Sequence, residues 1–186
     1  MGHSEQTVIV ERTWTSELLR SREDFTLTSG DTGHRLAGAV RVIRDEAPVE
    51  IAYYVDCAPD WTTRAAVVEI PELDIDLRLR ADAASWTVDG EPRPDLDGCV
   101  DVDLGWTPAT NTLPIRRLDT AADVPRTVRA AWLRWPELVV LPSDQTYTRR
   151  NDRLWTYASG KFSAELEVDE HGVVVNYGRP PIWAGE

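Results

Sequence analysis

The stretch of the chain with the clearest chemical potential is residues 95–118, where acidic and apolar residues alternate and a polar segment follows. In an extended chain, Asp97, Cys99, Asp101 and Asp103 share one face, and the apolar residues between them share the other. Neighbouring carboxylates on that face lie about 6.6 Å apart, so they repel one another unless arginines, water or a ligand compensates the charge. The acidic row therefore predicts either a solvated outer face or an acidic binding site.

The polar segment directly after the acidic row favours the binding site. It brings hydroxyl, amide and guanidinium groups close to the carboxylates, from Thr107, Thr110, Asn111, Thr112, Arg116 and Arg117. Together with an aromatic face, such groups suit a polyhydroxylated ligand. The candidate ligand-binding residues are Asp97, Asp101, Asp103, Asn111, Thr112, Arg64, Arg116, Trp61, Trp106 and Tyr147, and Tyr157 is a further candidate aromatic face. Asp101 and Asp103 are the strongest of them, and replacing both with Asn should preserve folding while weakening ligand binding.

The same two acids leave a catalytic alternative open. A carboxylate separation of about 6.6 Å lies near the lower edge of the roughly 6.5–9.5 Å used by inverting glycosidases, so Asp101 and Asp103 could serve a hydrolase of glycosidic or ester bonds. No environmentally distinct second acid is evident to act as proton donor, so binding without turnover is the main expectation and no catalytic residue is assigned. Asp101 with Asp103 is a weak calcium pattern, and the three histidines are scattered. We expect no metal and no cofactor.

Composition narrows the class of partner. The chain has 186 residues with 20 Lys+Arg against 32 Asp+Glu, a net charge of -12, which disfavours nucleic acids and anionic membranes. No secretory signal is evident, and no apolar run approaches the ~20 residues of a membrane span. A cytoplasmic protein is the expectation, with Cys57 and Cys99 reduced by default, although the sequence leaves a disulfide open.

Period-two alternation dominates the chain and predicts an all-β fold in a single domain, 1–186. The frequent turn residues favour a sandwich, a barrel or a curled sheet. One short helix is expected over 111–118, with Asn111 at the N-cap and Pro114 in the first turn. The expected strands are 36–43, 49–55, 62–70, 73–80, 127–135, 138–141, 145–149, 154–157, 162–168 and 173–177.

These residues resemble a bacterial family, the "Putative glycolipid-binding" family, formerly a domain of unknown function. The resemblance is carried by Leu96-Asp97-Gly98-Cys99-Val100-Asp101-Val102-Asp103-Leu104-Gly105, by Thr107-Pro108 and by Thr110-Asn111-Thr112-Leu113-Pro114-Ile115-Arg116-Arg117-Leu118. Supporting matches are Tyr54-Val55-Asp56-Cys57, Trp61-Thr62-Thr63-Arg64, Trp86-Thr87-Val88-Asp89-Gly90, Tyr147-Thr148-Arg149, Phe162-Ser163-Ala164-Glu165-Leu166 and Val173-Val174-Val175-Asn176-Tyr177. It is strongest over 36–177, and upstream of Gly33 only Trp14 fits.

The resemblance implies a fold, a ligand class and an assembly. The implied fold is a many-stranded antiparallel sheet curled into a half-barrel around one short helix, remotely similar to lipoprotein localization carriers. The implied function is a binding protein or carrier for a glycolipid or other sugar-headed amphiphile, held in an acidic pocket. The implied assembly is a homodimer.

Overall fold

The structure is a computed structural model that describes residues 6–83 and 85–186. In this part of the chain, fifteen strands form one sheet in the order β8-β7-β6-β5-β4-β3-β2-β1-β15-β14-β13-β12-β11-β10-β9. All neighbouring strands are antiparallel except β9 and β10, which are parallel. The strands are β1 (Thr7–Ser16), β2 (Ser21–Gly30), β3 (Gly33–Arg44), β4 (Ala47–Cys57), β5 (Thr63–Ile70), β6 (Ile75–Asp82), β7 (Ser85–Val88), β8 (Glu91–Pro92), β9 (Asp101–Leu104), β10 (Pro125–Leu133), β11 (Val140–Arg149), β12 (Leu154–Ser159), β13 (Phe162–Val168), β14 (Val174–Tyr177) and β15 (Trp183–Gly185).

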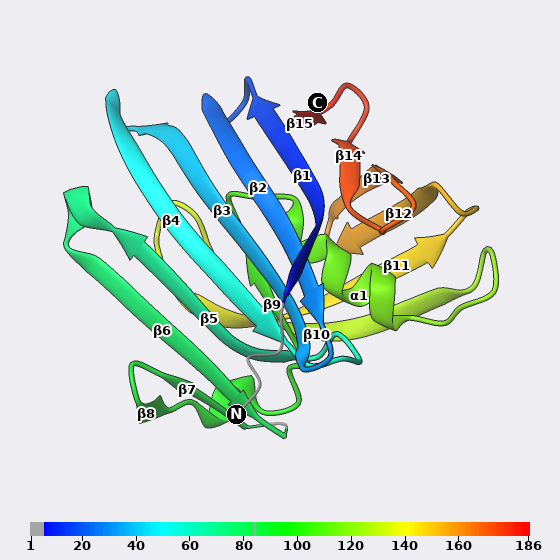
Figure 1. Cartoon of the computed structure of the whole chain (residues 1–186), viewed down its shortest axis with the longest axis horizontal. Helices are drawn as coiled ribbons and strands as arrows, with labels where there is room; N and C mark the ends of the chain where they lie inside the picture. Colours follow the sequence, from blue (N-terminus) through cyan, green and yellow to red (C-terminus); the bar gives the residue numbers. More distant parts are fainter. Residues whose placement is uncertain (1–5, 84) are drawn as a thin grey trace.

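The sheet bends strongly. Strands β1–β6 lie on one side of the bend and β10–β13 on the other, and helix α1 (Thr112–Arg117) lies between them (Figure 1). The bend brings the edge strand β9 close to the start of β5, where the Thr63 amide donates to the Val100 carbonyl at 3.2 Å. The Thr63 hydroxyl also accepts from the Val102 amide at 3.0 Å. The all-β class with one short α-helix is confirmed. The sheet is not closed into a barrel, so the expected half-barrel describes its curvature only loosely.

Inward-facing side chains of the alternating strands form the core. On β2, Phe25 and Leu27 are buried at every second position, as expected for a strand with one face on the core. Trp14 on β1 is fully buried, and its indole N–H donates to the Val174 carbonyl at 2.8 Å. This bond links β1 to β14, which lies beyond β15 in the sheet.

Two expectations about local structure need correction. Residues 138–149 contain one continuous strand, β11, rather than two. Asn111 occupies the N-cap position of α1 as expected, but it makes no side-chain capping bond: it lies in helical conformation in a 3₁₀ turn, η3 (Ala109–Asn111), and its side-chain amide donates to the Pro108 carbonyl at 3.0 Å. Two further 3₁₀ segments occur: Leu73, the first residue of the predicted strand 73–80, lies in η1 (Pro71–Leu73), and Leu96 lies in η2 (Pro94–Leu96).

Two other features bear on the sequence expectations. Cys57 and Cys99 are both free and buried. Within the described residues, no helix has the length and apolar character required to cross a membrane.

Candidate functional site

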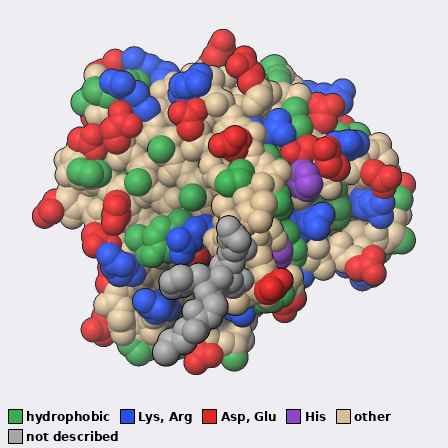
Figure 2. All heavy atoms as spheres, viewed as in Figure 1, with side chains coloured by type: hydrophobic (Ala, Val, Ile, Leu, Met, Phe, Trp, Pro, Cys, Tyr) green, Lys and Arg blue, Asp and Glu red, His purple; other side chains and the backbone are tan. Residues whose placement is uncertain are grey.

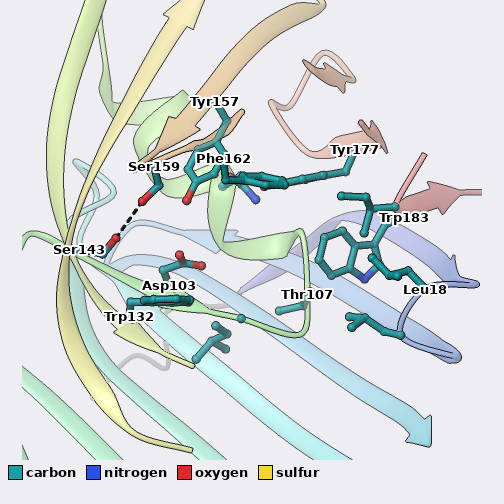
Figure 3. A pocket seen from close by; sticks show the side chains of 15 residues that line it. Leu18, Asp103, Thr107, Trp132, Ser143, Tyr157, Ser159, Phe162, Tyr177 and Trp183 are labelled. Atoms are coloured by element: carbon teal, nitrogen blue, oxygen red, sulfur yellow. Dashed lines mark hydrogen bonds between the residues drawn. The ribbon is translucent and has the colours of Figure 1, made fainter. Parts of the chain in front are cut away.

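A cavity of about 380 Å³ opens inside the bend of the sheet (Figure 3). This volume lies at the small end of the range of small-molecule sites. The apolar part of its wall comes from Leu18, Leu19, Leu104, Trp132, Tyr157, Phe162, Tyr177, Ile182 and Trp183. The polar part comes from Asp103, Thr107, Asn111, Ser143 and Ser159, and no arginine or lysine is among the described residues that line the cavity. The cavity thus combines an aromatic wall with one carboxylate and several neutral polar groups.

Asp103 on β9 supplies the carboxylate of the cavity. The Gln145 amide donates to its Oδ2 at 2.6 Å, and the Thr110 hydroxyl donates to its Oδ1 at 3.2 Å. Burial raises the pKa of Asp103 to about 6, and these two hydrogen bonds oppose the increase. Because its protein partners are neutral, the carboxylate is a strong acceptor for ligand hydroxyls.

Asp101, two residues earlier on β9, has a different environment. Its two carboxylate oxygens accept from the two terminal nitrogens of Arg117 on α1, the Oδ2 bond measuring 2.7 Å. Asp101 is buried and does not line the cavity. Burial raises the pKa of Asp101, whereas the Arg117 guanidinium lowers it. This carboxylate therefore fastens α1 to the edge strand of the sheet.

The acidic row of the sequence does not extend along one strand. Strand β9 begins at Asp101. Upstream, Gly98 has a φ of +82° and the Cys99 amide donates to the Leu96 carbonyl at 3.0 Å, so residues 96–99 form a turn. Asp97 is exposed beside this turn and lies outside the cavity. Of the predicted acids, the structure places Asp103 alone at the cavity.

Asn111 is the second predicted residue that lines the cavity. Its Oδ1 accepts from the Tyr147 hydroxyl at 2.9 Å, so Tyr147 lies behind the wall and orients the amide. Thr112 is fully buried and does not line the cavity. Asn111 is thus part of the polar side of the cavity wall, and Tyr147 supports it from behind.

The remaining predicted residues are elsewhere. Trp61 stacks on His34 with ring centroids 3.8 Å apart, and the Arg116 guanidinium lies 5.3 Å from the Trp61 ring. Arg64 donates to the Thr32 carbonyl at 2.7 Å. Trp106 is fully buried in the core. None of these four predicted residues, Trp61, Arg64, Arg116 and Trp106, lines the cavity.

A second buried carboxylate, Glu23 on β2, was missed. The Tyr53 hydroxyl and the Thr107 hydroxyl both donate to its Oε1, the latter at 2.9 Å, while Oε2 is buried without a hydrogen-bond partner among the described residues. Burial raises the pKa of Glu23 to about 7. Thr107 also lines the cavity, so Glu23 lies directly behind the wall. The available signal was that Glu23 alternates in phase with Phe25 and Leu27, which places it on the inward face.

A glycine makes room for this buried cluster. Gly38 on β3 lies opposite Tyr53, and a Cβ at Gly38 would come within 2.4 Å of the Tyr53 ring and 2.7 Å of Glu23 Oε1. Any larger residue would therefore push the tyrosine off the carboxylate. The cluster of Glu23, Tyr53 and Thr107 depends on the absence of a side chain at Gly38.

The aromatic wall was also missed, apart from Tyr157. Trp132, Phe162, Tyr177 and Trp183 come from four strands of the second half of the sheet. The indole N–H of Trp183 is buried without a hydrogen-bond partner among the described residues, and in Figure 3 its nitrogen faces Leu18. Only the bend of the sheet brings these rings together, so no local sequence signal identifies them.

The outer surface contrasts with the cavity. On the face seen in Figure 2, acidic and basic side chains are interspersed. Several of them form ion pairs, such as Arg35 with Asp56 at 2.6 Å and Arg150 with Asp123 at 2.7 Å. Among residues 6–83 and 85–186, no group of three or more His, Cys, Asp or Glu side chains is placed to hold a metal ion.

Comparison with known proteins agrees with the resemblance seen in the sequence. The model of the family described as "Putative glycolipid-binding" matches residues 11–180. The chain is also similar to the crystal structure of a DUF1089 family protein from Pseudomonas aeruginosa, with a TM-score of 0.76 and 32% sequence identity over 84% of this chain and 88% of that one. None of the curated proteins compared with the chain matches it. The family match extends over β2, where the sequence offered little support.

Proposed function

The chain belongs to the "Putative glycolipid-binding" family, and on that premise we propose that it binds a neutral, sugar-headed amphiphile in the cavity beside Asp103. The observation that carries the proposal is a carboxylate with neutral partners set in an otherwise largely aromatic wall. Sugar hydroxyls donate to such a carboxylate, and aromatic faces pack against sugar rings and alkyl chains. Of the acidic pocket expected from the sequence, the proposed site keeps a single acidic residue, Asp103.

Charge and size restrict the ligand further. With no arginine or lysine among the lining residues, a phosphate or sulfate head group would meet Asp103 without a compensating cation. A cavity of about 380 Å³ accommodates a head group and the first part of an alkyl chain. The remainder of a longer chain would have to leave through the mouth. The preferred ligand is therefore an uncharged glycoside with an apolar aglycone.

The geometry gives the hydrolase alternative little support. The paired-carboxylate reaction needs two acids on either side of one scissile bond. Asp101 is held by Arg117 and lies outside the cavity, so Asp103 has no second lining acid to work with. A carrier that binds without turnover is the function we propose. The free Cys57 and Cys99 are compatible with the reducing cytoplasm that we expect.

Asp103→Asn tests the site. We expect the affinity for octyl glucoside below its micelle concentration to fall about tenfold to a hundredfold, because a charge-assisted hydrogen bond contributes about 1.5–3 kcal/mol. Titration calorimetry at pH 8 measures it. For the wild type, affinity should also decrease as the pH falls through about 6, where the carboxylate becomes protonated. Asp97→Asn, at an exposed acid outside the cavity, is the matched control. Equal loss in both variants, or unchanged affinity in Asp103→Asn, would remove Asp103 from the site.

We also propose that the protein is a homodimer. The support is the family resemblance. The eight tryptophans of the sequence add little to it, because six of them are buried within the single chain. Sedimentation velocity over the micromolar range should give the mass of two chains. A single-chain mass at every concentration would contradict the proposal.

A further inference from the structure

The mouth of the cavity is unusually apolar for a solvent-facing surface. Leu18, in the turn between β1 and β2, is 73% exposed, and Phe162, at the start of β13, is 44% exposed. Both side chains line the cavity, so they stand where it opens to the outside. Single exposed apolar residues need no explanation, but exposed apolar residues gathered around one opening do.

A third exposed apolar residue lies next to a residue that lines the cavity. Leu141 on β11 is 38% exposed and is paired directly with Trp132 on β10, which lines the cavity. Residues directly opposite in an antiparallel pair project to the same face of the sheet, so Leu141 continues the apolar surface that Trp132 begins. Leu18, Phe162 and Leu141 thus form what we term the apolar mouth.

From this arrangement we infer that the apolar mouth docks on the surface of an electrically neutral lipid bilayer. The inference rests on the proposed function, because an amphiphile whose chain projects through the mouth leaves a bilayer most easily when the mouth is seated on it. The charges agree with a neutral surface. Lys161, the only lysine of the chain, is exposed next to Phe162, where its stem can lie along the lipid and its ammonium among the head groups. The net charge of -12 opposes an anionic surface.

Co-sedimentation of the full chain with pure phosphatidylcholine vesicles tests docking without any glycolipid. Leu18→Ser/Phe162→Ser should lower the partition coefficient about tenfold or more, because both side chains lose the transfer of apolar surface out of water. Val8→Ser/Val124→Ser, which removes two exposed apolar residues that do not line the cavity, should partition like the wild type. Adding phosphatidylserine to the vesicles should weaken binding of the wild type.

The outcomes separate docking from ligand binding. Asp103→Asn should still sediment with the vesicles although its octyl glucoside affinity falls. A wild type that sediments with the vesicles but does not bind octyl glucoside would contradict the proposed function and not docking. Brominated phosphatidylcholine should quench the tryptophan fluorescence of the wild type, since Trp132 lies beside the mouth; this readout does not depend on the folding of a variant. Docking is overturned if the wild type neither sediments nor is quenched. It is also overturned if the Leu18/Phe162 variant, shown folded by circular dichroism, sediments like the wild type.

Discussion

Asp101→Asn should lower the free energy of unfolding by about 3–5 kcal/mol, because it leaves the Arg117 guanidinium without its carboxylate in a largely buried setting. For a chain of this size, the melting temperature would fall by roughly 6–20 °C. Urea denaturation at pH 7 measures the change. This result would depart from the sequence-based expectation that Asn at both acids preserves folding, because that expectation treated Asp101 and Asp103 as equivalent.

Two variants test whether the pair is the cause. Asp97→Asn changes an exposed acid of the same segment and should leave the unfolding free energy within about 0.5 kcal/mol of the wild type. Asp101→Leu/Arg117→Met removes both charges, and it should recover much of the loss because no buried charge remains unpaired. A double variant that is less stable than Asp101→Asn would show that packing around β9, rather than the ion pair, sets the cost.

Glu23→Gln should stabilise the protein at alkaline pH. The pKa of Glu23 rises from an ordinary 4.5 to about 7 on folding, so the folded state holds a proton that the unfolded state releases. The stabilisation from this proton is complete below pH 4.5 and disappears as the pH rises through 7. At pH 8 the wild type therefore bears a cost of roughly 3 kcal/mol that glutamine avoids, and at pH 5 the advantage of Glu23→Gln should fall to about 1 kcal/mol.

Urea unfolding at pH 5, 6.5 and 8 resolves the effect. Asp103 also has a raised pKa, of about 6, so its effect on the pH dependence of stability falls mostly at lower pH than that of Glu23. The interval from pH 6.5 to 8 therefore reports mainly on Glu23. Glu11→Gln, at an exposed acid on the adjacent strand β1, should follow the wild-type pH dependence. If Glu23→Gln shows the same slope between pH 6.5 and 8 as the wild type, Glu23 does not titrate in this range.

Alternation predicted most strands of the second half and those from β3 to β6, because these strands bury one regular apolar face. It failed for β2, where the inward position before Phe25 and Leu27 is occupied by the charged Glu23, which hides the period. It also failed at Pro142, which looked like a break between two strands. Pro142 pairs with Ala131 on β10, whereas β12 joins β11 only from Thr146 onward, so the missing N–H falls on a locally free edge that tolerates proline.

The site was only partly predictable for a related reason. The polar segment pointed to Asp103 and Asn111, but Gln145, the partner that distinguishes Asp103 from Asp101, lies on a strand far along the chain. Arg116 was predicted to bind the ligand, although residue type alone does not distinguish it from Arg117. Helix geometry separates them: Arg117 reaches Asp101, while Arg116 lies over Trp61. Such choices depend on which strands the bend of the sheet brings together.

In the middle of the sheet, β1 pairs with β15, so two distant parts of the sequence meet there. Strands β1–β8 form one continuous meander, β9–β15 form the rest, and the two halves join where Trp14 faces Gly185. During synthesis, the first meander must therefore leave the ribosome with the edge of β1 unpaired until Trp183–Gly185 has emerged. An unpaired strand edge is a site of aggregation. The two halves of the sheet join through the pairing of β1 with β15, whose residues lie far apart in the sequence, and such long-range contacts are associated with slow folding.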